Sequence, residues 1–133
     1  MRQFRAPVLL AGGPPSLLEA IAGIVDPGEA PEECIRREAM EEAGLRLSRL
    51  EPLGAVWASP GYSTERVHLF LAPCTAADRT GKGGGLVEEQ EEISLCETGL
   101  ADLAGMLAQG SVADMKTLAL VQALALRRGE LFR

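Results

Sequence analysis

Acidic side chains at helical spacing are the residues of this chain that are best suited to chemistry. The run from Gly23 to Leu45 reads GIVDPGEAPEECIRREAMEEAGL, and it contains Glu38, Glu41 and Glu42 at spacings of three and four. Such spacings place side chains on neighbouring rows of one helix face. Like charges crowded together are costly unless a cation lies among them. Carboxylates suit hard cations such as Mg²⁺ or Mn²⁺, and phosphate chemistry is the simplest use of such a site.

A solvated acidic helix face is the alternative interpretation of these glutamates. Gly23, Glu29, Arg37 and Gly44, which are also in place, argue against it. Arg37 stands four residues before Glu41 and can brace its carboxylate by an ion pair, and the alternative is an ordinary surface pair of little value. We expect Glu29 to orient the preceding loop or a water molecule. The alternative for Glu29 is an acidic residue that favours the helix dipole.

Turn residues and periodicity indicate the elements that position this run. Asp26-Pro27-Gly28 predicts a loop, and Pro31 and Gly44 predict a helix from about Pro31 to Ala43. The other predicted segments are strands at 7–10, 17–22, 50–58, 66–71 and 91–96, a polar loop at 76–85, and helices at about 100–108 and 112–127. In the last helix, core packing is predicted for Met115, Leu118, Val121 and Leu124. Interleaved strands and helices predict an α+β fold in which helices sandwich a mixed sheet.

Composition narrows the classes of function. The 133 residues have a net charge of −6 and 47% hydrophobic residues, which predicts one domain over 1–133 and argues against a nucleic-acid partner. The three cysteines form no CxxC pair and His68 is the only histidine, so a zinc site is not expected. We expect reduced thiols, a cytoplasmic protein and no membrane partner.

The run at 23–45 also carries a family resemblance. It matches the Nudix box, which is Gly, five residues, Glu, seven residues, Arg-Glu, an apolar residue, any residue, Glu-Glu, any residue, Gly and an apolar residue. The chain therefore resembles the Nudix hydrolases, which implies a Nudix α/β/α sandwich. The resemblance further implies that Mg²⁺, or alternatively Mn²⁺, is held by Glu38, Glu42 and the carbonyl of Ala22. Glu41 and Arg37 would then serve the catalytic step.

Two further segments resemble one branch, the ADP-ribose and GDP-mannose pyrophosphatases. The opening RQFR implies that Arg5 contacts the diphosphate, and the SPG segment implies substrate binding by Pro60, Gly61 and Glu65. The segment from Gly83 to Ile93 resembles a mobile loop that brings a late glutamate over the metal site. Its glycines would supply backbone freedom, Glu89 would be the general base, and Glu91 would be an auxiliary metal ligand.

The resemblance implies hydrolysis of a nucleoside diphosphate sugar to a nucleoside monophosphate and a sugar phosphate. Two alternatives stay open: a housecleaning hydrolase of nucleoside triphosphates, and a non-catalytic nucleotide-binding module. Members of the branch carry a strand-rich N-terminal segment that contributes to a homodimer and to the nucleoside pocket. This sequence begins at the RQFR stretch. The resemblance implies a homodimer, but one to which that N-terminal segment would not contribute. Trp57 and Tyr62 could flank a base or sugar, although packing is the expectation for Trp57, and His68 is expected in the core or at a strand edge.

Overall fold

The first residues of the chain form an antiparallel sheet with two segments that are distant in sequence. The computed structural model describes residues 1–86 and 93–132. Strand β1 (Arg2–Phe4) lies between β2 (Ser16–Leu18) and β5 (Ile93–Ser94), with Gln3 opposite Leu17 on one side and Ile93 on the other. The sheet thereby places the start of the 19–30 loop, which follows β2, near residues 93–94.

A long hairpin forms the second antiparallel sheet. Its strands are β3 (Glu51–Trp57) and β4 (Arg66–Leu71), with Trp57 opposite Arg66 at the turn end. The register shifts between Pro52 and Gly54, and Gly54 adopts a φ of 115°, which a residue with a side chain rarely adopts. Every strand pair among the described residues is antiparallel, so the single mixed sheet of our prediction is not what these residues display.

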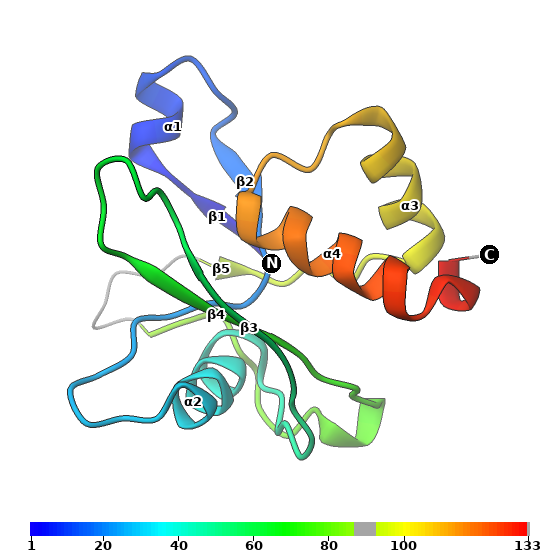
Figure 1. Ribbon diagram of the computed structural model, residues 1–133. Coiled ribbons are helices and arrows are strands. Elements are labelled where there is room, and N and C mark those ends of the chain that lie inside the picture. Colours follow the sequence, from blue (N-terminus) through cyan, green and yellow to red (C-terminus); the bar gives the residue numbers. More distant parts are fainter. Residues whose placement is uncertain (87–92, 133) are drawn as a thin grey trace.

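Helices pack on both sides of the hairpin. Helix α2 (Pro31–Ala43) lies below it in Figure 1, whereas α4 (Met115–Arg127) crosses above it next to α3 (Leu100–Gln109). A short helix α1 (Ala6–Leu10) connects β1 to β2. The 3₁₀ turns at Ala76–Asp78 and Gly129–Phe132 complete the described elements. Small and aliphatic side chains make up the buried apolar residues, including Cys34, Ala39, Ala43, Leu69, Ile93, Val112 and Val121.

Electrostatic contacts and a cap fix α4 at both ends. Asp114 caps its first turn, because its Oδ2 accepts hydrogen bonds from the Thr117 N–H at 2.8 Å and the Thr117 hydroxyl at 2.7 Å. At the other end, Arg127 and Arg128 each contact the Glu51 carboxylate at 2.7 Å, which joins the helix to β3. These contacts hold α4 over the hairpin.

The structure corrects two of the predicted segments near the N-terminus. Residues 7–10 are helical rather than a strand, because the N–H groups of Val8 and Leu9 both donate to the Arg5 carbonyl and Pro7 suits a first helical turn. The strand predicted at 17–22 is shorter and ends at Leu18. Apolar character alone did not distinguish a short helix from a strand.

The later predicted segments agree better with the structure. Helix α2 has the predicted bounds, and both hairpin strands and both C-terminal helices are present. Helix α4 begins at Met115 rather than near residue 112, since Asp114 caps it. Met115 is 56% exposed, so the prediction of a core position for it was wrong. In the strand predicted at 91–96, Ile93 is buried, but Leu95 lies partly exposed instead of facing inward.

Candidate active site

Two backbone signals fix the helix that carries the acidic residues. Pro31 occupies the first turn of α2, where its missing N–H costs nothing. At the other end Gly44 has a φ of 65°, and the N–H of Leu45 donates to the Ala39 carbonyl at 2.9 Å. This left-handed ending terminates the helix directly after Glu41 and Glu42.

Both glycines that bracket the box are required by close contacts. A Cβ on Gly23 would lie 1.9 Å from the Glu38 carboxyl carbon, so glycine is what allows Glu38 to lie directly on the 22–23 backbone. A Cβ on Gly44 would lie 2.1 Å from the Gly81 carbonyl oxygen. Gly23 therefore has a steric role, whereas Gly44 is demanded by both its φ angle and its neighbour.

Glu42 is the most deeply buried charged residue of α2. Its exposure is 1%, and its Oε2 accepts a hydrogen bond from the Ala22 N–H at 3.2 Å. Glu38 is 8% exposed and reaches the adjoining Gly23. The loop backbone at 22–23 thus meets two carboxylates from successive turns of one helix. Because burial penalises charge, such carboxylates are stabilised by positive partners.

Arg37 binds three of the neighbouring carboxylates. Its Nε and Nη2 contact Glu29 at 3.0 and 3.2 Å, and its Nη1 contacts Glu38 at 2.7 Å and Glu41 at 3.2 Å. Nη2 also donates to the Ile24 carbonyl at 3.2 Å. We call Glu29, Arg37, Glu38 and Glu41 the Arg37 cluster. The predicted ion pair with Glu41 is present. Arg37 makes one contact with Glu41 but two hydrogen bonds with Glu29, one to each carboxylate oxygen.

The charges of the Arg37 cluster affect the protonation of its neighbours. Hydrogen bonds from Arg37 and from the Asp26 N–H hold the pKa of Glu29 below its usual value, and the hydrogen bonds with Glu29 and Glu38 raise the pKa of Arg37. Burial and the nearby carboxylate of Glu29 raise the pKa of Cys34 to about 11. Glu29 and Arg37 are therefore charged at neutral pH, while the buried Cys34 thiol beside them stays protonated.

The glycine run at 83–85 is fastened to the end of α2. The N–H groups of Gly84 and Gly85 donate to the carbonyls of Glu42 and Glu41 at 2.8 and 3.1 Å. All three glycines have positive φ angles, and a Cβ on Gly83 would lie 2.5 Å from the Glu42 carbonyl oxygen. We expected these glycines to provide freedom, but they satisfy the unpaired carbonyls of the helix end.

The donor atoms near Gly23 are of the kind that hard divalent cations bind. Glu38, Glu41 and Glu42 offer carboxylate oxygens, and the adjoining 22–23 backbone offers carbonyls, as Mg²⁺ and Mn²⁺ prefer. Within residues 1–86 and 93–132, no three His, Cys, Asp or Glu side chains form a group that could hold a metal ion. The donors fit such a cation by their chemistry although these side chains do not form such a group, and Arg37 Nη1 contacts the Glu38 carboxylate at 2.7 Å.

A second group of charges forms around Glu19, which is 4% exposed. Arg5 binds both of its carboxylate oxygens, at 2.8 and 3.0 Å, and the Lys116 Nζ lies 3.7 Å from it. Lys116 also contacts Asp114 at 2.7 Å. We call Arg5, Glu19, Asp114 and Lys116 the Arg5 cluster. The hydrogen bond with Glu19 raises the pKa of Arg5, so its side chain stays charged while it is held in one direction.

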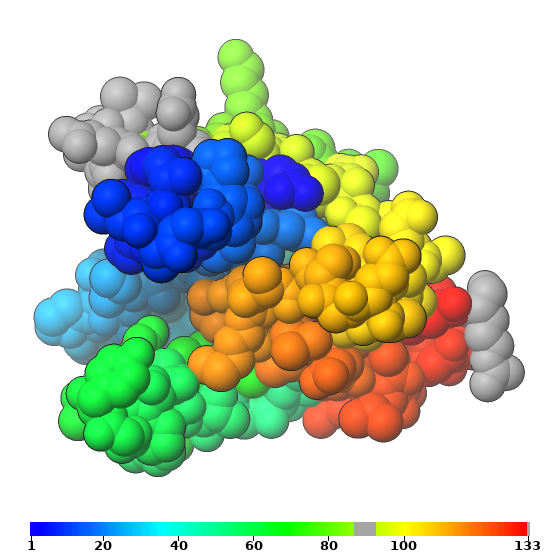
Figure 2. Space-filling model, turned by 90° about the horizontal axis from the view of Figure 1, so that it is seen from above, coloured from blue at the N-terminus to red at the C-terminus, as the bar shows by residue number. Residues whose placement is uncertain are grey.

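Two residues of each cluster line one cavity of about 830 Å³, a size typical of ligand pockets. Arg5 and Lys116 contribute to its wall together with Arg37, Glu38 and Gly23. The N-terminal segment, the start of α4 and the tip of the β3–β4 hairpin surround a hollow in the view from above (Figure 2). The cavity thus combines the Glu38 carboxylate of α2 with cations from the residue after β1 and from α4.

The SPG segment forms the turn of the hairpin at the edge of this cavity. The Ser59 carbonyl accepts hydrogen bonds from the N–H groups of Tyr62 and Ser63 at 3.2 and 2.9 Å. Glu65 follows and lines the cavity, whereas Pro60 and Gly61 are exposed and do not belong to its described lining. The turn therefore places Glu65, rather than Pro60 or Gly61, against the cavity.

The structure brings most of the predicted site residues together. Ala22, Arg37, Glu38, Glu41 and Glu42 meet at the loop and helix, although Ala22 contacts Glu42 through its N–H. Arg5 and Glu65 share the cavity with Ala22, Arg37 and Glu38, whereas Glu41 and Glu42 do not belong to its described lining. Glu89 and Glu91 lie outside the described residues. Their expected roles stay predictions.

Sequence reasoning gave no role to Glu19 and Lys116. Glu19 stands between Leu18 and Ala20 in a predicted strand, and this isolated charge in an apolar segment was the available signal of a buried ion pair. Lys116 lies in the D-M-K-T stretch, where a helix was predicted and no contact with Arg5 or Glu19 was expected. Their meeting with Arg5 depends on contacts between segments about a hundred residues apart, which no local pattern reveals.

Several smaller expectations can be compared with the structure. His68 is exposed on β4 and lines the cavity, which fits the strand-edge alternative. Trp57 is 52% exposed, so the expectation that it packs was wrong. Cys34, Cys74 and Cys96 are free thiols. Among the described residues, no helix has both the length and the apolar character needed to cross a bilayer.

Comparison with known proteins agrees with this site. A model of the NUDIX domain matches residues 2–118, which is most of the chain. The helices and antiparallel sheets described above are consistent with that family's α+β fold.

Curated relatives extend the similarity along the sequence. The chain is 42% identical over 128 residues to a GDP-mannose pyrophosphatase of Cronobacter sakazakii, covering 96% of this chain and 65% of the relative. It is 40% identical over 127 residues to a GDP-mannose pyrophosphatase of Pectobacterium atrosepticum, covering 95% and 64%. The chain thus spans slightly less than two thirds of the length of these relatives.

Proposed function

The chain belongs to the Nudix family, and we propose that it hydrolyses a nucleoside diphosphate sugar of the GDP-mannose or ADP-ribose type. The products would be a nucleoside monophosphate and a sugar phosphate. One observation carries this proposal: a single cavity is lined by Arg37 and Glu38 of helix α2 and by Arg5 and Lys116. A carboxylate suited to a cation and side chains suited to a diphosphate thus share one space. We also propose that residues 1–133 form one Nudix domain.

Hydrolases of this family use divalent metal ions, and we propose Mg²⁺, or alternatively Mn²⁺, for this chain. Glu38, Glu42 and the carbonyl of Ala22 would hold the ion, with Glu91 as an auxiliary ligand. When bound, it would act as a Lewis acid and neutralise charge on the diphosphate. The buried position of Glu42 supports this, because the hydrogen bond from the Ala22 N–H holds a carboxylate oxygen beside the 22–23 backbone.

The residues of the chain would act mainly by binding and orientation. Arg5 and Lys116 would hold diphosphate oxygens, with Glu19 and Asp114 keeping them directed toward the cavity. Arg37 would keep Glu41 and Glu38 in place. Glu89 is proposed to accept the proton of the attacking water. In-line attack on phosphorus requires positioning and charge stabilisation more than covalent chemistry.

A side-by-side substrate comparison tests the proposal. GDP-mannose, ADP-ribose and dGTP would be incubated with the protein and Mg²⁺, and the products separated by ion-exchange chromatography. We expect a nucleoside monophosphate and a sugar phosphate from at least one of the first two. Release of pyrophosphate from dGTP alone would instead indicate a nucleoside triphosphate hydrolase. Binding without turnover would indicate a non-catalytic module, and a Glu38→Gln variant prepared in parallel would reveal contaminating activity.

Two accompanying predictions concern the environment of the protein. We propose a homodimer, to be measured as molar mass by light scattering during size-exclusion chromatography. A cytoplasmic location also stays a prediction. Fractionation of expressing cells would test it, since recovery of the chain in the membrane fraction would contradict it.

A further inference from the structure

We propose that Arg66, held over the exposed ring of Trp57, is the stacking surface for the nucleobase of the substrate. Arg66 would contact the base directly, and Trp57 would position Arg66. This inference rests on the proposed function for the kind of ligand. It adds where the base binds and which side chains of this chain recognise it.

The β3–β4 hairpin builds this pair at its turn end. Trp57 and Arg66 are opposite each other in the antiparallel register, so their side chains lie on the same face of the sheet. The guanidinium carbon lies over the Trp57 ring, 4.9 Å from its centroid, and Nη2 reaches the Ala55 carbonyl at 3.5 Å. One face of the guanidinium is therefore occupied by the ring, while Arg66 as a whole is exposed.

The charge environment separates Arg66 from the other cations of the cavity. Arg5, Arg37 and Lys116 each form ion pairs with carboxylates. Arg66 also lines the cavity, but within residues 1–86 and 93–132 no carboxylate lies at ion-pair distance from it. A planar cation that already lies on an aromatic ring can accept a second ring on its open face.

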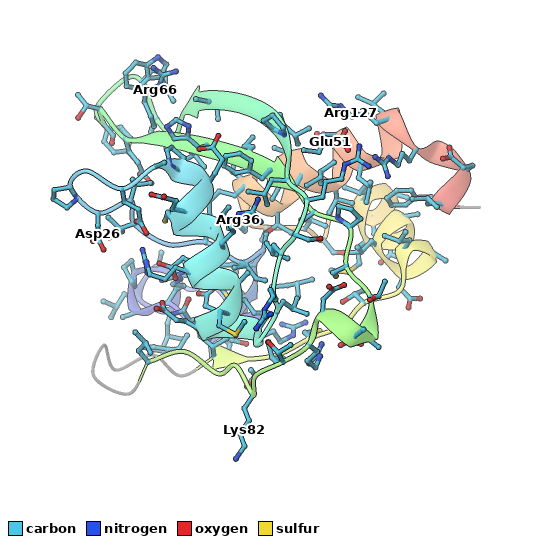
Figure 3. All side chains as sticks on the ribbon, turned by 90° about the horizontal axis from the view of Figure 1, so that it is seen from below. Asp26, Arg36, Glu51, Arg66, Lys82 and Arg127 are labelled. Atoms are coloured by element: carbon cyan, nitrogen blue, oxygen red, sulfur yellow. The ribbon has the colours of Figure 1, made fainter. Side chains whose placement is uncertain are left out.

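The cavity offers apolar surface in addition to this planar cation. Ile24 and Val25 line it from the loop before α2, and they are 85% and 39% exposed. Figure 3 shows Arg66 at the hairpin end on the same side of the molecule as Asp26 of that loop, away from Glu51 and Arg127. Apolar side chains and a planar cation suit a flat heterocycle, whereas Arg5 and Lys116 suit the diphosphate.

Arg66 could alternatively bind a phosphate, and its chemistry separates the two cases. A phosphate requires positive charge, which lysine would preserve. A base requires the planar guanidinium, which lysine lacks. The Arg66→Lys variant therefore distinguishes stacking from charge, while Arg66→Gln removes both.

Trp57 is the only tryptophan of the chain, so its fluorescence reports directly on this position. The full chain would be titrated with guanosine, GMP and mannose 1-phosphate, with excitation at a wavelength selective for tryptophan and correction for nucleotide absorbance. We expect guanosine and GMP to change the emission and mannose 1-phosphate to leave it unchanged. Equal changes with mannose 1-phosphate, or no change with any of the three, would overturn the proposal.

Calorimetric titration with GMP tests the side chains. We expect Arg66→Gln and Arg66→Lys to raise the Kd at least about fivefold, as loss of a base stack does. Arg46→Gln, which changes an exposed arginine elsewhere, should leave the Kd unchanged. A normal Kd in Arg66→Lys would identify Arg66 as a phosphate ligand and contradict the proposal. Thermal denaturation of each variant would confirm that it is folded.

Trp57 needs a test of positioning rather than of contact. Trp57→Phe keeps a ring beneath Arg66 and should leave the Kd for GMP within about twofold, whereas Trp57→Ala should raise it as Arg66→Gln does. Equal Kd values for Trp57→Ala and the parent would contradict the positioning role. All these measurements record binding, so they succeed or fail independently of whether the nucleotide sugar is hydrolysed.

Discussion

The Arg37 cluster and the Arg5 cluster use the same chemistry but are assembled in opposite ways. The Arg37 cluster draws all its residues from positions 29–41, so its partners are brought together as soon as the helix and its preceding loop form. The Arg5 cluster joins the residue after β1, the residue after β2 and the start of α4. The first cluster is therefore a property of a local motif, whereas the second exists only in the completed fold.

The largest effect is expected from Glu42→Gln, which tests the acidic helix. We expect kcat to fall on the order of 10³-fold, because a charge that would hold the cation is lost. The melting temperature should be nearly unchanged, since a glutamine oxygen can still accept the Ala22 N–H. Glu32→Gln on the exposed first turn of the same helix is the matched control. A kcat within tenfold of the parent, at saturating Mg²⁺, would remove Glu42 from the catalytic site.

Arg37→Lys tests whether the Arg37 cluster depends on the guanidinium. Lysine cannot reproduce the two contacts with Glu29 and the contacts with Glu38 and Glu41 at once. We expect a loss of about 1–3 kcal/mol in the free energy of unfolding in urea, together with a lower kcat. Arg46→Lys, at an exposed position outside the cluster, is the control and should change neither the free energy of unfolding nor kcat. Wild-type stability in Arg37→Lys would show that charge alone maintains the cluster.

Arg5→Lys makes the corresponding change in the Arg5 cluster. We expect KM for the nucleotide sugar to rise about tenfold while kcat stays within about threefold, because a diphosphate contact present throughout the reaction is weakened. The loss of stability should stay below about 1 kcal/mol, since the Arg5 side chain is 41% exposed. Arg2→Lys, at an exposed position of strand β1, is the control. A fall in kcat with unchanged KM would place Arg5 closer to the catalytic step than we propose.

The Asp114→Asn substitution should give the smallest effect, and its effect on stability should depend on pH. Burial works against the charge of Asp114, but hydrogen bonds from Lys116 and Thr117 outweigh it and lower the pKa. A lowered pKa stabilises the folded state above the ordinary value of about 4, and this contribution is lost as the pH falls through the folded-state pKa. Because asparagine can still cap α4, we expect a difference of under about 1 kcal/mol at pH 7 that disappears in acid.

Melting temperatures of the parent and the Asp114→Asn variant across pH 3–7 would measure this contribution. Asp102→Asn in the first turn of α3 serves as the control for a general loss of negative charge. A difference that persists unchanged at pH 3 would mean that packing, rather than ionisation, explains it.

The sequence was sufficient where the determining contacts are local. Pro31 and Gly44 gave the bounds of α2, and the spacing of the glutamates placed them on one face. It was insufficient for residues 7–10, where a proline and apolar residues suit a strand or a short helix equally. It also could not reveal that Glu19 joins Arg5 to Lys116, because no periodicity encodes contacts between positions 5, 19 and 116.

The two glycines of the box also imply different patterns of epistasis. Gly23 is confined by the side chain of Glu38, so a shorter residue at position 38 would release it, although the acidic group would then be lost. Gly44 is confined by its own φ angle and by the backbone carbonyl of Gly81, which no side-chain replacement removes. In paired-substitution libraries, a shorter residue at position 38 should therefore restore folding to variants at position 23, but it should not restore their catalytic activity. Variation at 44 should find no single rescuing partner.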